Sequence, residues 1–123
     1  MVSPSKEKYL IEIFVNLNEE GYTRVSQLAK SLQVSVPSVS KMVKKLNDEE
    51  YIKFQRYGII TLTDKGKDLC EQLLKNRLVL IRFFKFIGVE EEIVEDEVKA
   101  IQHNLSVDVI EKIDGFLAKY QSM

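Results

Sequence analysis

Apolar residues recur at helical spacing in the first part of the chain. In the first such segment they are Tyr9, Leu10, Ile13, Phe14 and Leu17. This spacing predicts an amphipathic helix over Ser5–Glu20, which Gly21 ends. Two more helices are predicted over Val25–Leu32 and Val36–Asp48, and only a short connection separates them. The first half of the chain therefore begins as three short helices.

The pattern changes from helical to strand-like after residue 50. Tyr51–Arg56 and Ile59–Thr63 are rich in β-branched and aromatic residues, which predicts two short strands. Gly58 supplies the positive φ of a tight hairpin between them. A strand pair this short, directly after two helices, is typical of the wing of a winged helix.

The second half of the chain is predicted to be helical. The ranges are Asp64–Ile87, Glu90–His103 and Ser106–Tyr120. Thr63 and Ser106 are the expected N-caps, and Gly88 ends the long helix. The helices after Gly88 carry apolar stripes that so short a chain covers poorly alone, which favours a dimer. We therefore expect a mainly α fold, with a winged helix-turn-helix domain over residues 1–63 and a linking helix and helical dimerisation domain over residues 64–123.

Charge is distributed unevenly along the 123 residues, although the net charge is only -1. Residues 24–67 contain nine Lys and Arg against four acidic residues, whereas residues 88–114 contain nine acidic residues against two Lys. A basic segment that coincides with the helix-turn-helix and the wing favours contact with phosphates, and the acidic segment does not. The charge alone is equally compatible with two solvated faces of opposite sign.

The two short helices satisfy the packing of a helix-turn-helix. Ala29 falls at the close crossing of the helices, and Gln33 stands in the turn where many such motifs have Gly. The positions expected to be buried are Leu28, Leu32, Val34, Val39 and Met42. Because the wing follows at once, duplex DNA is the expected ligand.

The second helix and its surroundings supply hydroxyl and ammonium groups for DNA. The candidate DNA-binding residues are Arg24, Ser35, Pro37, Ser38, Ser40, Lys41, Lys44 and Arg56. Small hydroxyls can approach base edges, whereas Lys and Arg contact phosphates. Neither Arg, Asn nor Gln lies between Ser35 and Lys45, so specificity is expected to depend on DNA shape and on paired half-sites.

Other classes of protein are disfavoured by what the sequence lacks. It has one cysteine, Cys70, and one histidine, His103, which excludes a disulfide framework and a zinc site of several thiolates. We found neither a nucleophilic triad nor a glycine-rich phosphate loop, so an enzyme is not expected. Cys70 is expected to pack as a small apolar residue. The sequence shows neither a signal peptide nor a membrane-spanning run, and we expect a cytoplasmic protein.

Five runs of residues resemble the manganese transport regulator branch of the diphtheria-toxin-repressor family. They are Ser3-Pro-Ser-Lys-Glu-Lys-Tyr-Leu, Gly21-Tyr-Thr-Arg-Val-Ser-Gln-Leu-Ala, Ser38-Val-Ser-Lys-Met-Val-Lys-Lys-Leu, Leu62-Thr-Asp-Lys-Gly and Ile87-Gly-Val-Glu-Glu. The resemblance extends without gaps to about Phe116. It implies a homodimeric repressor that manganese or iron activates, with a winged helix-turn-helix followed by a helical dimerisation domain.

The metal ligands of that family are not retained. The family has Asp and Glu on the first helix, a His on the linking helix, and two Glu and a His on the next helix. The residues at these six positions are Lys8, Ile11, Arg77, Lys99, Gln102 and His103. Only His103 remains, and three cations at one locus would repel a dication. We expect neither a metal nor another cofactor, although a rebuilt site that combines His103 with nearby glutamates stays open.

Two hypotheses describe what replaces the metal. In one, Lys8, Arg77 and Lys99 pair with neighbouring acids such as Glu7, Glu12, Glu95 or Glu97 and take over its clamping role. In the other, these three cations bind a small anionic effector. We expect a sequence-specific, dimeric transcriptional regulator, a repressor, that binds a palindromic duplex without metal. The alternative is a protein-binding adaptor or a heterodimer partner of a metal-dependent paralogue.

Overall fold

The structure is a computed structural model that describes residues 2–121. The chain divides into two compact units, unit 1 (residues 1–71) and unit 2 (residues 72–123), and the division falls within the long helix α4 (Asp64–Phe86). The described residues are mainly helical and carry a small sheet, which confirms the expected fold class. No helix in this part of the chain is long and apolar enough to cross a bilayer.

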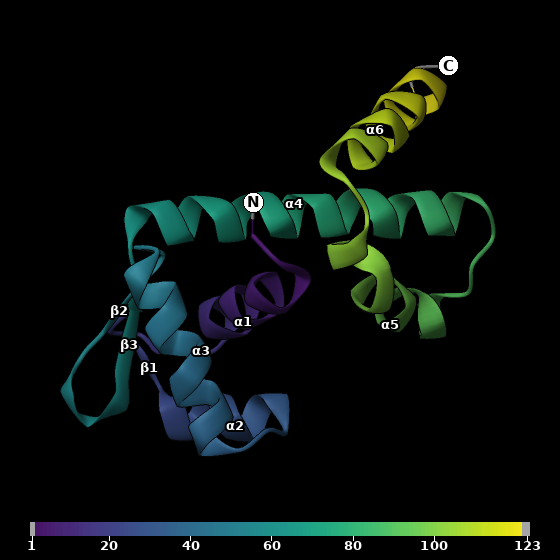
Figure 1. Ribbon diagram of the computed structural model, residues 1–123. Coiled ribbons are helices and arrows are strands. Elements are labelled where there is room, and N and C mark those ends of the chain that lie inside the picture. The colour runs from purple at the N-terminus through teal and green to yellow at the C-terminus, as the bar shows by residue number, and fades with distance from the viewer. Residues whose placement is uncertain (1, 122–123) are drawn as a thin grey trace. The chain divides into compact units, whose positions relative to one another are not determined.

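Unit 1 contains the predicted helix-turn-helix and wing. Its elements are α1 (Pro4–Val15), β1 (Thr23–Arg24), α2 (Val25–Leu32), α3 (Val36–Asp48), β2 (Ile52–Phe54), the 3-10 turn η1 (Arg56–Gly58), β3 (Ile59–Leu62) and the first turns of α4. The strands form an antiparallel sheet in the order β1-β3-β2, in which Ile60 of β3 lies opposite both Thr23 and Phe54 (Figure 1). Helices α2 and α3 have the predicted bounds.

The first helix is shorter than predicted because asparagine side chains replace helical hydrogen bonds. Helix α1 ends at Val15 rather than Glu20. The Asn16 side-chain amide donates to the carbonyl of Glu12 at 2.8 Å, which closes the last turn. The side-chain oxygen of Asn18 then accepts the backbone N–H groups of Glu20 and Tyr22, at 3.0 and 3.1 Å, and bends the chain toward β1.

The sheet differs from the predicted hairpin in two respects. Strand β1 was not predicted, because two residues are too few to show an alternating pattern. Strands β2 and β3 are shorter than their predicted ranges, and η1 connects them. Gly58 has the expected positive φ of 73°, but Tyr57 before it is also left-handed, with a φ of 63°. The turn at the wing tip therefore places an aromatic residue in a conformation that non-glycine residues rarely adopt.

The core of unit 1 joins α1, both helices of the motif, the sheet and the start of α4. Its buried members include Leu10, Leu28, Val39, Val43, Leu46, Ile60 and Cys70. The burial predicted for Leu28 and Val39 is confirmed, and Leu32 and Met42 are partly buried against the same core. Val34 is exposed rather than buried, because Gln33 before it takes the left-handed conformation and turns the chain outward.

Unit 2 consists of the rest of α4, α5 (Glu91–Ile101), the 3-10 turn η2 (Gln102–Asn104) and α6 (Val107–Gln121). Leu80, Val94, Val98 and Ile110 form its buried core. Helix α5 ends two residues before the predicted His103, since the chain tightens there into η2. The Ser106 hydroxyl accepts the N–H of Val109 at 3.3 Å and caps α6, as predicted.

A close backbone approach sets the start of α4 against the end of the helix-turn-helix. The Thr63 hydroxyl accepts the N–H of Gly66 at 3.1 Å, which confirms the predicted cap. The N–H of Thr63 in turn donates to the carbonyl of Tyr51 at 3.1 Å. A Cβ atom on Gly66 would lie 2.0 Å from that carbonyl oxygen, so the contact requires glycine.

We expect Gly66→Ala to destabilise the protein by about 1–3 kcal/mol, because backbone must move to admit the methyl group. Gly115→Ala on α6 is the matched control, since nothing lies within 4 Å of its added Cβ. It should stabilise the helix by about 0.5–1 kcal/mol. Urea denaturation of both variants measures the two effects, and a Gly66→Ala variant as stable as the wild type would contradict the close approach.

Candidate nucleic-acid interface

The N-terminus of α3 is built from the predicted serine and proline positions. The Ser35 hydroxyl accepts the N–H of Ser38 at 3.2 Å and donates to the Ser38 hydroxyl at 2.8 Å. Pro37 occupies the first turn, where a missing N–H costs nothing. These three residues are exposed, so the helix start presents hydroxyl groups while it remains capped.

The outward face of α3 is basic. Lys41, Lys44 and Lys45 are exposed, and in the described part of the chain no hydrogen bond or ion pair engages their ammonium groups. Ser40 is half-buried, and Val36 at the helix start is 49% exposed. Val36 was not among the predicted residues, although an apolar side chain there could contact a thymine methyl group.

Besides the pairing of β3 with β1, side-chain hydrogen bonds join the wing to α3, the recognition helix of the motif, and to Arg24 of β1. The Asn47 side-chain oxygen, at the end of α3, accepts the N–H of Phe54 in β2 at 2.9 Å. Arg24 donates from Nη1 to the carbonyl of Tyr57 at 3.3 Å, so its guanidinium supports the wing tip. Arg56 at that tip is exposed. The sequence did not indicate the roles of Asn47 and Tyr57, because both depend on contacts with other elements.

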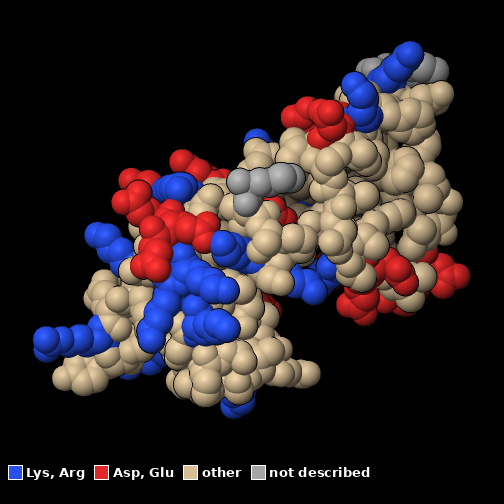
Figure 2. Space-filling view, viewed as in Figure 1, with Lys and Arg blue, Asp and Glu red and all other residues tan. Residues whose placement is uncertain are grey.

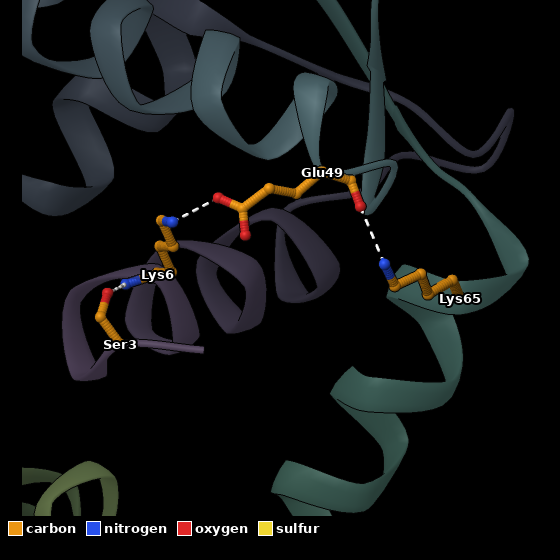
Figure 3. Close-up of polar contacts among 4 residues, drawn as sticks. All are labelled: Ser3, Lys6, Glu49 and Lys65. Atoms are coloured by element: carbon orange, nitrogen blue, oxygen red, sulfur yellow. Dashed lines mark hydrogen bonds and ion pairs between the residues drawn. The ribbon is translucent and has the colours of Figure 1, made fainter. Parts of the chain in front are cut away.

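The residue that follows α3, Glu49, connects three elements (Figure 3). Its carboxylate pairs with the Lys6 ammonium of α1, and its carbonyl accepts the Lys65 ammonium at 2.9 Å. Lys65 also lies 4.3 Å from the centre of the Tyr51 ring. These two lysines are therefore engaged inside unit 1 and are poor candidates for phosphate contacts.

Basic side chains gather on the side of unit 1 that holds the helix-turn-helix. On the face seen in Figure 2, Lys and Arg side chains cluster over this part, while Asp and Glu side chains lie over the start of α4 in the same unit and over α5. The basic cluster agrees with the charge pattern of residues 24–67. It allows one surface of unit 1 to approach a polyanion.

In unit 2, the residues at two positions where the resemblance implies metal ligands are bonded to each other. Arg77 Nε on α4 donates to Gln102 Oε1 at 2.9 Å, and Gln102 Nε2 donates to the carbonyl of Leu73 at 2.5 Å. Gln102 is only 2% exposed, and His103 beside it is also buried. Lys99 is exposed. A side-chain hydrogen-bond link therefore joins η2 to α4 at this place.

The six residues at the positions where the resemblance implies metal ligands offer little to a manganese or iron ion. The ammonium and guanidinium groups of Lys8, Arg77 and Lys99 are cationic donors without acceptor capacity, and Ile11 is a buried hydrocarbon. Within residues 2–121 no group of three or more His, Cys, Asp or Glu side chains is arranged to hold a metal ion. The donor chemistry of this chain thus differs from that of a carboxylate metal site.

Cys70 is fully buried in unit 1, as expected. Its thiol donates to the carbonyl of Leu10 at 3.3 Å. Burial, and to a smaller extent the charge of Glu71, raises the pKa of the Cys70 thiol from 9.0 to about 12. A neutral, buried thiol is a poor nucleophile, so the structure disfavours redox sensing at this residue.

Comparisons with protein families and with known sequences give one consistent result. Residues 1–60 match the family described as "Iron dependent repressor, N-terminal DNA binding domain", and residues 63–122 match "Iron dependent repressor, metal binding and dimerisation domain". The HTH-type transcriptional regulator MntR of Geobacillus thermodenitrificans is 38% identical over 98% of this chain and 86% of its own length. MntR of Bacillus velezensis is 40% identical over 98% of this chain and 84% of its own length.

Solved structures agree with the sequence matches. The metal-dependent transcriptional regulator MtsR superposes with a TM-score of 0.78 at 29% identity. The match covers 95% of this chain and 55% of the MtsR chain. The arrangement of helix-turn-helix, wing and following helices is therefore shared with regulators of this group.

The raised pKa of Cys70 predicts a loss of stability in alkali. Unfolding releases the thiol to ionise near pH 9.0, whereas the folded protein keeps it neutral to about pH 12. The free energy of unfolding should therefore fall between these values, by at most about 1.4 kcal/mol per pH unit. Urea titrations at several pH values test this. The Cys70→Ala variant is the control, because it lacks the fall in the free energy of unfolding that ionisation of the thiol causes. Equal pH dependence of the two proteins would contradict the assignment.

Proposed function

The chain belongs to the family of iron-dependent repressors, and from this premise we propose that it binds palindromic duplex DNA as a homodimer without a bound metal ion. Members of this family are DNA-binding transcriptional regulators and not enzymes, which agrees with the absence of catalytic motifs in the sequence. The DNA-binding function follows from the family. Metal independence, the palindrome and the choice of dimer surface are our proposals.

The exposed basic face of α3 supports the DNA-binding part of the proposal. Lys41 and Lys44 are unpaired within the described residues and can neutralise phosphates, whereas the serines at the helix start can approach base edges. Arg56 extends the same basic surface to the wing. Because these contacts are mostly electrostatic, affinity should depend steeply on salt concentration.

The hydrogen bond between Arg77 and Gln102 is the main observation that supports metal independence. Both residues stand at positions where the family resemblance implies metal ligands. A guanidinium is protonated at all physiological pH values, so this link needs no metal to form. The buried Gln102 also bonds to the α4 backbone, which holds η2 in place. We infer that unit 2 is permanently in the arrangement that a metal would otherwise stabilise.

An apolar groove in unit 2 supports the homodimer. It has a volume of about 510 Å3 and lies between the end of α4 and α6. Its lining residues are Phe83, Ile87, Val109, Lys112, Ile113 and Phe116. Phe86 and Tyr120 continue the apolar surface, with ring centres 5.9 and 4.5 Å from that of Phe116. A second copy is the occupant we propose, because the matched region is a dimerisation domain.

The decisive experiment is selection of duplexes from a random pool, in parallel with a strong chelator and with added Mn2+. We expect both selections to converge on the same palindrome with equal affinity. MtsR, which is described as metal-dependent, serves as the control that should lose binding in chelator. Convergence only with Mn2+ would refute metal independence, and failure of both selections would favour the protein-binding adaptor.

Lys44→Gln tests the interface itself on the selected duplex. Removing one phosphate contact should weaken binding and lower the slope of log affinity against log salt by about 1. Lys75→Gln is the matched control, because it removes the same charge from an exposed position in unit 2. If both variants keep the wild-type slope, α3 is not the phosphate-binding surface.

Phe116→Glu tests the dimer surface. A buried carboxylate in an apolar interface is costly, so this variant should be monomeric at concentrations where the wild type is dimeric. Val107→Glu is the control, since Val107 is exposed on the same helix outside the groove. Sedimentation equilibrium gives the molecular mass of each. A dimeric Phe116→Glu variant would place the interface elsewhere.

A further inference from the structure

Tyr57 at the wing tip combines high exposure with a left-handed backbone conformation. Tyr57 is 85% exposed, more than any other large hydrophobic side chain in the described part of the chain. Its φ of 63° lies in the left-handed region. The other left-handed non-glycine residues, Gln33 and Glu50, have flexible polar side chains. A bulky ring at such a position is strained, and strain of this kind is concentrated at functional sites.

The backbone beneath Tyr57 is held from two sides. Its carbonyl accepts the Arg24 guanidinium at 3.3 Å. The N–H of Gln55 donates to the carbonyl of Ile59 at 2.8 Å and closes the loop. Arg24 itself lies 5.7 Å from the centre of the Tyr22 ring. The tip is therefore fixed while the Tyr57 ring projects from it.

The wing tip belongs to the same compact unit as the recognition helix. Within unit 1, β2 is bonded to the end of α3 through Asn47, and the loop at the end of the hairpin extends away from the helices (Figure 1). With α3 in a groove of the duplex, a residue that projects from this loop can reach the sugar-phosphate backbone beside that groove. Tyrosine hydroxyls commonly donate to phosphate oxygens of DNA.

We propose that Tyr57 contacts the sugar-phosphate backbone of the duplex, with its hydroxyl donating to a phosphate oxygen. This inference rests on the proposed DNA-binding function. Arg24 is the positioning residue, because it holds the Tyr57 carbonyl and thereby the direction of the ring. The contact is neutral, so it contributes affinity without releasing a counterion and without selecting a base.

The Tyr57→Gly variant distinguishes a loss of DNA contact from a loss of folding stability. We expect affinity for the selected palindrome and for a scrambled duplex to fall by about three- to tenfold, the equivalent of one hydrogen bond. The salt slope should stay at the wild-type value, unlike that of Arg56→Gln, which should decrease by about 1. The urea midpoint should equal or exceed that of the wild type, because glycine relieves the left-handed backbone.

Two further variants complete the experiment. Tyr57→Phe keeps the ring and should lose only the part of the affinity that the hydroxyl supplies. Gln33→Gly relieves a comparable backbone position and should raise the urea midpoint, which gives the size of that relief in the absence of a ring. Wild-type affinity in Tyr57→Gly, or a midpoint below that of the wild type, would overturn the proposed contact. Absence of duplex binding by the wild-type protein would instead overturn the function on which it rests.

Discussion

The recognition helix depends on how its C-terminal end is held. Burial of Val39, Val43 and Leu46 stabilises α3 against the core, but the hydrophobic effect is non-directional. Hydrogen bonds at the end of α3 add directional contacts. Asn47 bonds to the wing, and Glu49 connects to α1 and to the start of α4. The ion pair is partly exposed and contributes little energy, so its value is geometric. Recognition helix and wing can therefore meet DNA as one body.

The residues at the positions where the resemblance implies metal ligands bear on the proposed metal independence. A metal ion activates a regulator only by binding one conformation more tightly than another. Under our proposal, the bond between Arg77 and Gln102 supplies an equivalent stabilisation, and its occupancy does not depend on metal concentration. The DNA-binding half carries hydroxyls and lysines, whereas none of the six implied ligand positions carries a carboxylate. The proposal therefore assigns DNA contact to the first half and the permanent link to the second.

The composition of α3 separates the contacts that give DNA affinity from those that give sequence specificity. Between Ser35 and Lys45 the helix has no Arg, Asn or Gln, the side chains that read bases in a bidentate manner. Under the proposed function, its lysines supply affinity rather than sequence information. Much of the discrimination is then expected from the spacing of two half-sites and from duplex shape, both of which a dimer measures. Contacts between the wing and the sugar-phosphate backbone would strengthen this recognition of shape, because they fix the orientation of unit 1 on the duplex.

Much of the fold was predictable because it depends on residues that lie close together in the sequence. The apolar spacing located α2 and α3, Thr63 and Ser106 marked helix starts, and the charge pattern located the basic surface. The end of α1 was missed, since it depends on how the Asn16 and Asn18 side chains orient. By itself the sequence determined the fold class and the basic character of the DNA-binding half, and it placed cations and an amide where the resemblance implies metal ligands. Only the tertiary structure decided that Arg24 supports Tyr57 and that Arg77 bonds to Gln102, because these partners lie 33 and 25 residues apart and meet only through packing.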